Sequence, residues 1–323
     1  MSSSTPTDRV AGALLGSIVG DALGASWEFS QMFPLSRAGV TPETLSHRFS
    51  SLWAAGEWTD DTQQALLVAQ SLMERGDVDQ DHIWMLLRQW FEAGPKDVGI
   101  TTSISLSAGG RPHPNLPNWE HSAGNGSLMR ATPLAIFVAE HANGRRSARE
   151  MEVSFLTHPD PRAAFACMLY GEMVRAAFRG QDVLSVLDIA MAKLAVSRRH
   201  SDLFPPSILD KFHEVFADGW SPYYAEDANG VAWVTLGTAV WVLRQGWPFR
   251  QAMWEVIEIG GDTDTVACVT GGLVGAVQGI KAIPEEWLTP LHGSVIGNQD
   301  SGYGWRELVH LASALSEFGA NLA

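Results

Sequence analysis

Apolar side chains recur at steps of three and four residues through most of this 323-residue chain. In residues 62–75, Leu66, Ala69 and Leu72 would share one face of a helix, and Gly76 follows as a stop signal. No segment shows the sustained β-branched alternation that is typical of strands. The pattern therefore predicts an all-α chain, with helices over residues 9–24, 62–75, 82–93, 162–179, 183–194, 231–244, 250–259, 265–280 and 305–318.

Loops rich in glycine and proline join these helices, and the longest is expected over residues 103–126. A loop of that length inside a compact chain is usually functional or mobile. Neither a break in composition nor a repeat of fixed period divides the chain. We therefore expect a flexible N-terminus over residues 1–8 and a single domain over residues 9–323.

The chain is strongly acidic, with 36 Asp and Glu residues against 22 Lys and Arg and a formal net charge of −14. Binding to a nucleic-acid backbone requires a basic face, so we expect no direct binding of that kind. A small ligand that carries phosphate is still permitted, because helix N-termini and metal ions hold phosphate groups.

The sequence gives little sign of export or membrane insertion. Cys167 and Cys268 lie in apolar helical segments and cannot build a disulfide framework, which favours a reducing compartment. No apolar run reaches the length of about 18 residues that a membrane helix needs. Residues 11–20 faintly resemble a signal peptide, but residues 1–8 carry no basic side chain and Asp21 ends the run. We therefore expect a cytoplasmic protein with no membrane partner.

Two short acidic segments each stand directly before a predicted helix: Trp58-Thr59-Asp60-Asp61-Thr62 and Gly260-Gly261-Asp262-Thr263-Asp264-Thr265. Helix capping is one interpretation, because Asp and Thr are favoured N-caps and acids there complement the helix dipole. Capping needs one oxygen per helix, however, and each segment supplies two carboxylates without any Lys or Arg.

A divalent cation would neutralise these acids if the two segments are buried. Carboxylate and hydroxyl oxygens are hard ligands, which suit Mg²⁺, Mn²⁺ or Ca²⁺ better than Zn²⁺. The sequence contains no HExxH or CxxC motif for a common zinc site. Four acids from two segments could hold two ions about 3.5–4 Å apart, as in two-metal enzymes. The spacing alone leaves capping and metal binding both open.

Further motifs accompany the acidic segments in a recognisable order: Gly16 to Gly24 followed by Glu28-Phe29, Thr59 to Thr62, Asp97-Val98-Gly99 with Thr101-Thr102, Gly124 to Arg130, Thr157-His158, and Gly260 to Thr265. In these motifs, which span most of the chain, the sequence resembles the ADP-ribosylglycohydrolases. That family includes dinitrogenase reductase-activating glycohydrolase and the ADP-ribosylarginine and ADP-ribosylserine hydrolases.

The resemblance implies a compact, orthogonal multi-helix bundle with a central cleft that holds two Mg²⁺ or Mn²⁺ ions. It implies the metal ligands Thr59, Asp60, Asp61, Asp262, Asp264 and Thr265. Glu28 and Asp97 are the implied catalytic acids, one as the acid or base and the other as an orienting group, with a metal contact open for Glu28. By residue type alone, Glu28 could be a solvated acid at a helix end and Asp97 a turn former after Pro95.

The diphosphate of the implied substrate needs hydrogen-bond donors, and the glycine-rich run from Gly124 offers backbone N–H groups. Arg130 could contact phosphate or tie this run to the core. Gly271, Gly272 and Gly275 favour close helix packing over ligand contact. The expected substrate-binding residues are Gly124, Asn125, Gly126, Ser127, His158 and Tyr224.

The implied activity is hydrolysis of the bond between ribose C1″ and an acceptor, which releases ADP-ribose from an ADP-ribosylated protein or small molecule. Arg-linked substrates are preferred, because the motif spacing is closest to the bacterial nitrogenase-regulating group. Ser-linked, poly(ADP-ribose) or nucleic-acid-linked substrates are the near alternative. Residues 219–237 follow the family pattern loosely and residues 103–126 do not match it, so the acceptor stays open.

Two other classes of function are weighed against this one. A non-catalytic, ADP-ribose-binding relative would tend to lose acids from the metal motifs, whereas all four acids and both threonines are present here. A metal-dependent phosphohydrolase fits the hard-ligand site, but the motif spacing does not resemble that of such enzymes. We expect the protein to be a monomer.

Overall fold

The computed structural model describes residues 4–29, 52–111, 123–141, 143–196, 206–297 and 299–322. Over these residues the chain forms α-helices and short 3₁₀ turns, with isolated β-bridges but no strand, so the all-α prediction is confirmed. Within the same residues, no helix is both long and apolar enough to cross a bilayer.

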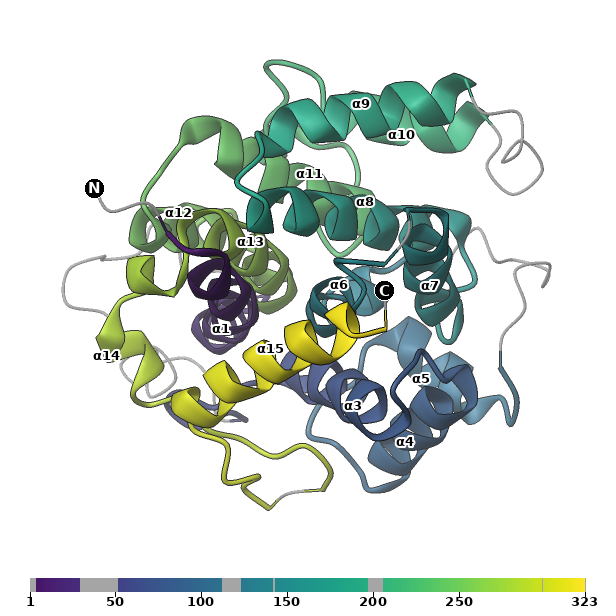
Figure 1. Cartoon of the computed structure of the whole chain (residues 1–323), viewed down its shortest axis with the longest axis vertical. Helices are drawn as coiled ribbons and strands as arrows, with labels where there is room; N and C mark the ends of the chain where they lie inside the picture. Colours follow the sequence, from purple (N-terminus) through teal and green to yellow (C-terminus); the bar gives the residue numbers. More distant parts are fainter. Residues whose placement is uncertain are drawn as a thin grey trace.

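The helices stack around a central pair, as Figure 1 shows. In chain order the elements are α1 (Pro6–Gly24), α3 (Asp60–Arg75), α4 (Gln80–Glu92), α5 (Ile100–Ser107), η2 (Asn125–Ser127), α6 (Thr132–Phe137), α7 (Asn143–Phe155), α8 (Pro161–Phe178), α9 (Val183–Val196), α10 (Pro206–Val215), η4 (Pro222–Tyr224), α11 (Ala232–Gln245), α12 (Phe249–Ile257), α13 (Thr263–Gln278), η5 (Ile280–Ala282), α14 (Glu285–Leu288) and α15 (Trp305–Ala320).

The central pair is α1 and α13, which lie side by side and antiparallel (Figure 1). Glycines make this approach possible: a Cβ atom on Gly16 would lie 2.2 Å from the carbonyl oxygen of Gly271, and one on Gly12 would lie 2.3 Å from that of Gly275. The expectation that the glycines of α13 serve packing is confirmed at these positions. The apolar run at residues 11–20 is the buried centre of α1.

The antiparallel pairing sets the end of α1 against the start of α13. There the hydroxyl of Thr263 donates to the carbonyl oxygen of Gly24 at 2.8 Å. The start of α3 joins the same place, because the buried carboxylate of Asp21 accepts hydrogen bonds from the backbone N–H groups of Thr59 and Thr62, each at 3.1 Å. Three helix ends therefore meet at one point, and two of them carry the acidic segments.

Several boundaries differ from the sequence predictions. Residues 103–107, expected in the long loop, belong to α5, whose Ile-Thr-Thr-Ser-Ile-Ser-Leu-Ser sequence combines low helix propensity with little periodicity. Residues 112–122 of that loop lie outside the described residues. Part of the segment expected to be flexible, residues 1–8, is ordered: Thr5 caps α1 in a capping box with Asp8. Helices α6, α7, α10 and α14 were not predicted.

Candidate active site

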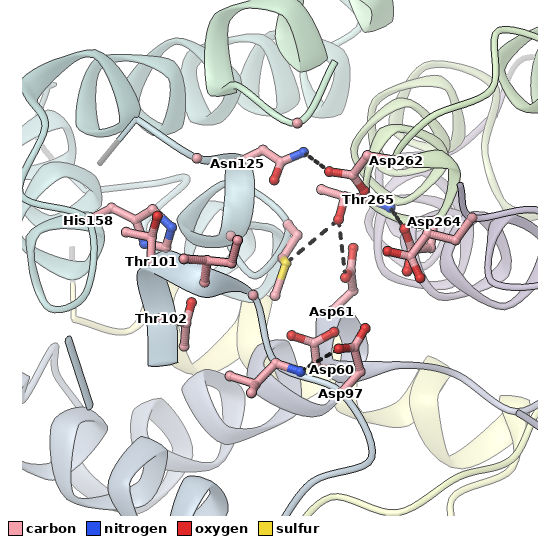
Figure 2. A pocket seen from close by; sticks show the side chains of 18 of the residues that line it. Asp60, Asp61, Asp97, Thr101, Thr102, Asn125, His158, Asp262, Asp264 and Thr265 are labelled. Atoms are coloured by element: carbon pink, nitrogen blue, oxygen red, sulfur yellow. Dashed lines mark hydrogen bonds between the residues drawn. The ribbon is translucent and has the colours of Figure 1, made fainter. Parts of the chain in front are cut away.

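A cavity of about 410 Å³ opens where the three helix ends meet. Six carboxylate side chains line it together with small, hydroxyl and apolar residues, and no Lys or Arg is among its lining residues. Figure 2 shows Asp60, Asp61 and Asp97 on one side, Asp262 and Asp264 on another, and His158 on a third. The lining residues are Glu28, Phe29, Asp60, Asp61, Asp97, Val98, Gly99, Ile100, Thr101, Thr102, Gly124, Asn125, Gly126, Met129, His158, Gly230, Asp262, Asp264 and Thr265.

The carboxylates come from separate parts of the chain. Asp60 and Asp61 form the first turn of α3, and Asp262 and Asp264 flank the first residue of α13. Glu28 follows α1, and one oxygen from each of Glu28, Asp262 and Asp264 lies within 4.8 Å of the others. Five of the six acids therefore come from the helix ends that the α1–α13 pairing brings together, and Asp97 comes from the loop before α5.

Burial strongly disfavours the charged forms of these acids. It raises the pKa values of Asp60, Asp61 and Asp264 well above their usual range, and the neighbouring carboxylates raise them further. Burial, followed by the charge of Asp97, raises the pKa of Glu28 to about 8. The Oδ1 atom of Asp61 is buried without any hydrogen-bond partner in the described structure. The described residues that line the cavity thus include no cationic side chain to compensate these acids.

The two threonines of the expected metal set both contact Asp61. Thr59 caps α3: its hydroxyl oxygen accepts from the N–H of Asp61 at 3.3 Å, and its hydroxyl lies 3.4 Å from Asp61 Oδ2. Thr265 of α13 donates to the same Oδ2 at 3.3 Å. The capping interpretation is therefore confirmed for the Thr59 hydroxyl, while all four carboxylates of the two segments line the cavity.

Asp262 is held by two asparagines. Nδ2 of Asn125 donates to Asp262 Oδ2 at 2.9 Å, and the N–H of Asp262 donates to Oδ1 of Asn229 at 3.3 Å. Asn125 was expected to bind substrate, and the structure gives it a carboxylate partner at the cavity wall. Asn229 was missed by the sequence analysis. It packs against Gly261, whose φ of +74° is a left-handed conformation that favours glycine.

Asp21 is a second residue that the sequence analysis did not assign to the site. Burial raises its pKa to about 6, although hydrogen bonds from Thr62 and Thr59 oppose the shift. It does not line the cavity, but it anchors the acidic turn of α3. The available signal was a carboxylate at the end of an otherwise apolar run of α1, where an unpaired charge would be costly.

The expected substrate-binding residues divide into two groups. Gly124, Gly126 and His158 line the cavity with Asn125. A Cβ atom on Gly126 would lie 3.0 Å from Cε1 of His158, so this glycine makes room for the imidazole. Ser127 points elsewhere and accepts a hydrogen bond from the hydroxyl of Ser154 at 2.8 Å. The structure does not bring Tyr224 to the cavity either, since its side chain on η4 is 86% exposed and is not among the lining residues.

The chemistry of the donor set fits a pair of hard divalent cations. The lining carboxylates offer oxygen ligands. Among the residues that the structure describes, the lining carries no competing ammonium or guanidinium group, and one buried carboxylate oxygen has no hydrogen-bond partner. A cavity with carboxylates on several walls also suits reactions in which positive charge develops on a bound substrate.

Comparisons with known proteins give matches over most of the chain. The sequence profile of the ADP-ribosylglycohydrolase family matches residues 2–320. The chain is 30% identical over 292 residues to "ADP-ribosylarginine hydrolase Tri1" of Pseudomonas putida, covering 87% of this chain and 73% of that protein. It is 28% identical over 290 residues to "ADP-ribosyl-[dinitrogen reductase] glycohydrolase" of Rhodospirillum rubrum, covering 88% and 90%.

The fold has a counterpart among solved structures. A chain described as "ADP-ribosylglycohydrolase-related protein complex" superposes with a TM-score of 0.74 at 30% sequence identity, covering 97% of this chain and 99% of the other. The match extends over the helices that build the cavity as well as those that surround it. Profile, relatives and fold lead to one conclusion: this chain belongs to the ADP-ribosylglycohydrolase family.

Proposed function

We propose that this protein hydrolyses the bond between C1″ of a terminal ribose and an acceptor side chain, releasing ADP-ribose, with arginine-linked ADP-ribose as the preferred substrate. The observation that carries the proposal is the convergence of six carboxylates on one cavity, including a buried Asp61 oxygen that has no hydrogen-bond partner among the described residues. The arginine preference is supported by the relative from Pseudomonas putida, whose name is that of an ADP-ribosylarginine hydrolase.

The proposed metal ligands are Thr59, Asp60, Asp61, Asp262, Asp264 and Thr265, which would hold two Mg²⁺ or Mn²⁺ ions. When bound, the ions would supply the missing positive charge and fix a water molecule and the ribose hydroxyls. Asp21, Asn125 and Asn229 would keep these ligands in place from behind, because each hydrogen-bonds to one of the two acidic segments.

The remaining two acids would act on the ribosyl bond. Cleavage passes through a state with oxocarbenium character, in which positive charge grows at C1″ and nearby carboxylates lower its energy. Glu28 lies beside Asp262 and Asp264, and Asp97 lies near Asp60; the charge of Asp97 also acts on Glu28, so both acids can reach a ligand in the one cavity. One would transfer the proton and the other would orient the reacting groups. The N–H groups of Gly124, Gly126 and Ser127 would hold the diphosphate, whereas that of Asn125 already donates to the carbonyl oxygen of Gly230.

Incubation of the purified chain with Arg-linked, Ser-linked and nucleic-acid-linked ADP-ribose, each with Mg²⁺, Mn²⁺ or EDTA, tests the proposal. The expected result is free ADP-ribose from the Arg-linked substrate with either metal and none with EDTA. Release of AMP and ribose phosphate would instead support a phosphohydrolase. Tight binding of ADP-ribose without turnover of any substrate would support a non-catalytic relative.

A further inference from the structure

A buried chain of hydrogen bonds joins two walls of the cavity behind its surface. Nδ1 of His158 lies 2.8 Å from the hydroxyl oxygen of Thr157, which accepts from Nη2 of Arg130 at 2.6 Å. Nη1 of the same arginine donates to Oε1 of Gln64 at 2.8 Å, and Nε2 of Gln64 donates to Oδ2 of Asp60 at 3.0 Å. All five residues are buried, and Thr157, Arg130 and Gln64 are fully so. Arg130 therefore ties its segment to the core. Of the two roles that the sequence left open for it, the structure favours this one over contact with a phosphate group.

The direction of this chain fixes where the proton of His158 sits. A guanidinium group can only donate, so the oxygen of Thr157 must accept from Arg130. The Thr157 hydroxyl can then donate its own proton. Within the described structure, Nδ1 of His158 is the only acceptor that lies within hydrogen-bond distance of this hydroxyl. A proton on Nδ1 would instead leave that fully buried hydroxyl without an acceptor, which carries a desolvation cost. The neutral imidazole therefore carries its proton on Nε2.

The Nε2 edge of the ring is the one that meets the cavity. A Cβ atom on Gly126 would lie 3.1 Å from Nε2, one on Gly124 would lie 3.6 Å from it, and both glycines line the cavity with His158. Figure 2 shows the ring beside Thr101 and Thr102 at this wall. None of the hydrogen bonds found within the described residues involves Nε2, so a bound ligand is its natural partner.

We propose that Arg130 and Thr157 are positioning residues that hold the proton of His158 on Nε2, so that the neutral imidazole donates a hydrogen bond to an anionic or hydroxyl oxygen of the ligand. Gln64 extends the support to Asp60, so one arginine steadies the donor on one wall and a carboxylate on another. Only the identity of the ligand rests on the proposed function, because the position of the proton is a property of the free protein.

The electrostatic surroundings keep the imidazole neutral. Burial, and then the positive charge of Arg130, lowers the pKa of His158 well below its usual value. A neutral donor can hydrogen-bond to a ligand oxygen without forming an ion pair with the carboxylates across the cavity. The arginine thereby has two effects on His158, one through the hydroxyl of Thr157 and one through its charge.

Nitrogen NMR of the full chain labelled with ¹⁵N-histidine tests the position of the proton directly, with His158→Gln identifying the signal. We expect the Nε2–H tautomer of His158 in the parent and in Thr157→Ser, which keeps the hydroxyl, and a mixture of tautomers in Thr157→Val. An Nδ1–H tautomer in the parent would overturn the proposal. This outcome needs neither substrate nor metal, and it does not require the Thr157→Val variant to fold.

Binding of ADP-ribose, measured by calorimetry, tests the consequence. Loss of one neutral hydrogen bond is expected to raise the Kd of Thr157→Val by roughly threefold to tenfold, with Thr157→Ser close to the parent. The control is Thr270→Val, because the hydroxyl of Thr270 is buried in α13 without a hydrogen-bond partner in the described structure. An unchanged Kd in Thr157→Val would reject the ligand role. A chain that binds ADP-ribose as expected but hydrolyses no substrate would reject the proposed function and leave this inference intact.

Discussion

Two regions of the molecule bury clusters of charge, and they do so in opposite ways. Between α7 and α8, Nη2 of Arg146 lies 3.0 Å from Glu172, and Nη2 of Arg175 lies 2.6 Å from it. Glu150 is buried beside them against Gly171. The cavity, by contrast, gathers carboxylates from three helix ends and a loop without an arginine or lysine among its lining residues.

The two regions differ in the source of the positive charge that their carboxylates require. Although burial alone would raise it, hydrogen bonds from Arg175 and Arg146 bring the pKa of Glu172 below its usual value. The α7–α8 cluster thus pairs the Glu172 carboxylate with arginines of the same chain, which is the pattern of a structural element. In the cavity, burial and mutual repulsion raise the pKa values of Asp60, Asp61 and Asp264, so positive charge from outside the chain would stabilise their ionised forms.

The largest expected effect comes from removing a carboxylate from the cavity. Loss of a residue that merely supports a metal ligand typically costs 10- to 100-fold, so Asp264→Asn should lower kcat/KM by more than about 100-fold. The variant should also lose most of the rise in Tm that Mg²⁺ or Mn²⁺ is expected to give the parent. Steady-state assays and thermal unfolding across a metal titration measure both effects.

The matched control for this prediction is Asp218→Asn, because the side chain of Asp218 is fully exposed and its ion pair with Arg244 is long, at 3.7 Å. It should leave turnover and the metal response unchanged. If the Tm of the parent does not respond to either ion, the metal hypothesis is wrong, and the contrast between the two clusters loses its functional meaning.

The second prediction concerns the α7–α8 cluster, in which arginines pair with the carboxylate of Glu172. Arg146→Met removes one of the two cations beside Glu172 and should lower the free energy of unfolding by about 3–5 kcal/mol, the usual cost of leaving a buried charge unpaired. The loss of unfolding free energy should be the same with and without Mg²⁺, and kcat per folded molecule should be unchanged. Chemical denaturation with and without Mg²⁺ measures the loss of unfolding free energy.

Arg145→Met serves as the neighbouring control on α7, since Arg145 is half exposed and pairs with Asp77 at the surface at 2.9 Å. It should change stability by no more than about 1 kcal/mol. A loss as large as that of Arg146→Met would show that the helix, rather than the buried pairing, accounts for the effect.

Between the two extremes lies Asp21, a buried carboxylate whose partners are uncharged N–H and O–H groups. Asp21→Asn replaces one acceptor oxygen by a donor that faces the N–H groups of Thr59 and Thr62, and it should cost about 1–3 kcal/mol. Because these groups begin the acidic turn of α3, the variant should also weaken the metal response. Thermal unfolding with and without Mg²⁺ separates the two effects; a full response to the ion would contradict the anchoring role.

The sequence indicated the cavity more clearly than the α7–α8 cluster. The two acidic segments could be recognised because local spacing places four acids at helix starts, and the all-α pattern followed from periodicity alone. The cluster could not be recognised, because it depends on the register of α7 against α8: a Cβ atom on Gly171 would lie 1.5 Å from Oε1 of Glu150, and no motif predicts that contact.

The site residues also divide into those that a local sequence pattern predicts and those that depend on contacts between distant parts of the chain. Asp60, Asp61, Asp262 and Asp264 were found from their own sequence neighbourhood, and the structure brings them to one cavity. Asn229 was missed because its role arises only when residues far apart in the chain meet, at the turn before α13. Tyr224 was expected near the ligand from a loosely matched segment, and the structure places it exposed on η4, outside the lining residues of the cavity.

The smallest effect is expected at Glu150, where the two clusters are most alike. Burial, and then the charge of Glu172, raises the pKa of Glu150 well above its usual value, which favours its protonated form in the folded protein. A raised pKa gives stability that is fully present below the unfolded value of about 4.3 and is lost as the pH rises toward the folded value. At pH 5, Glu150→Gln should therefore differ from the parent by less than about 1 kcal/mol, since glutamine resembles the protonated acid.

As the pH rises from 5 to 7, the parent should lose stability relative to Glu150→Gln, by up to about 1.4 kcal/mol per pH unit. Denaturation of both proteins along this pH series measures the trend. Glu152→Gln is the matched control, because Glu152 lies on the same helix and pairs with Arg149 at a partly exposed position; it should show no such trend. If the parent instead becomes more stable relative to Glu150→Gln as the pH rises, Glu150 is ionised in the folded protein. The attraction of Arg146 and Arg175 would then outweigh the desolvation cost of burying its charge. Two arginines would then neutralise two carboxylates in the α7–α8 cluster, and the contrast would become sharper with the cavity, whose described lining residues supply no cationic side chain.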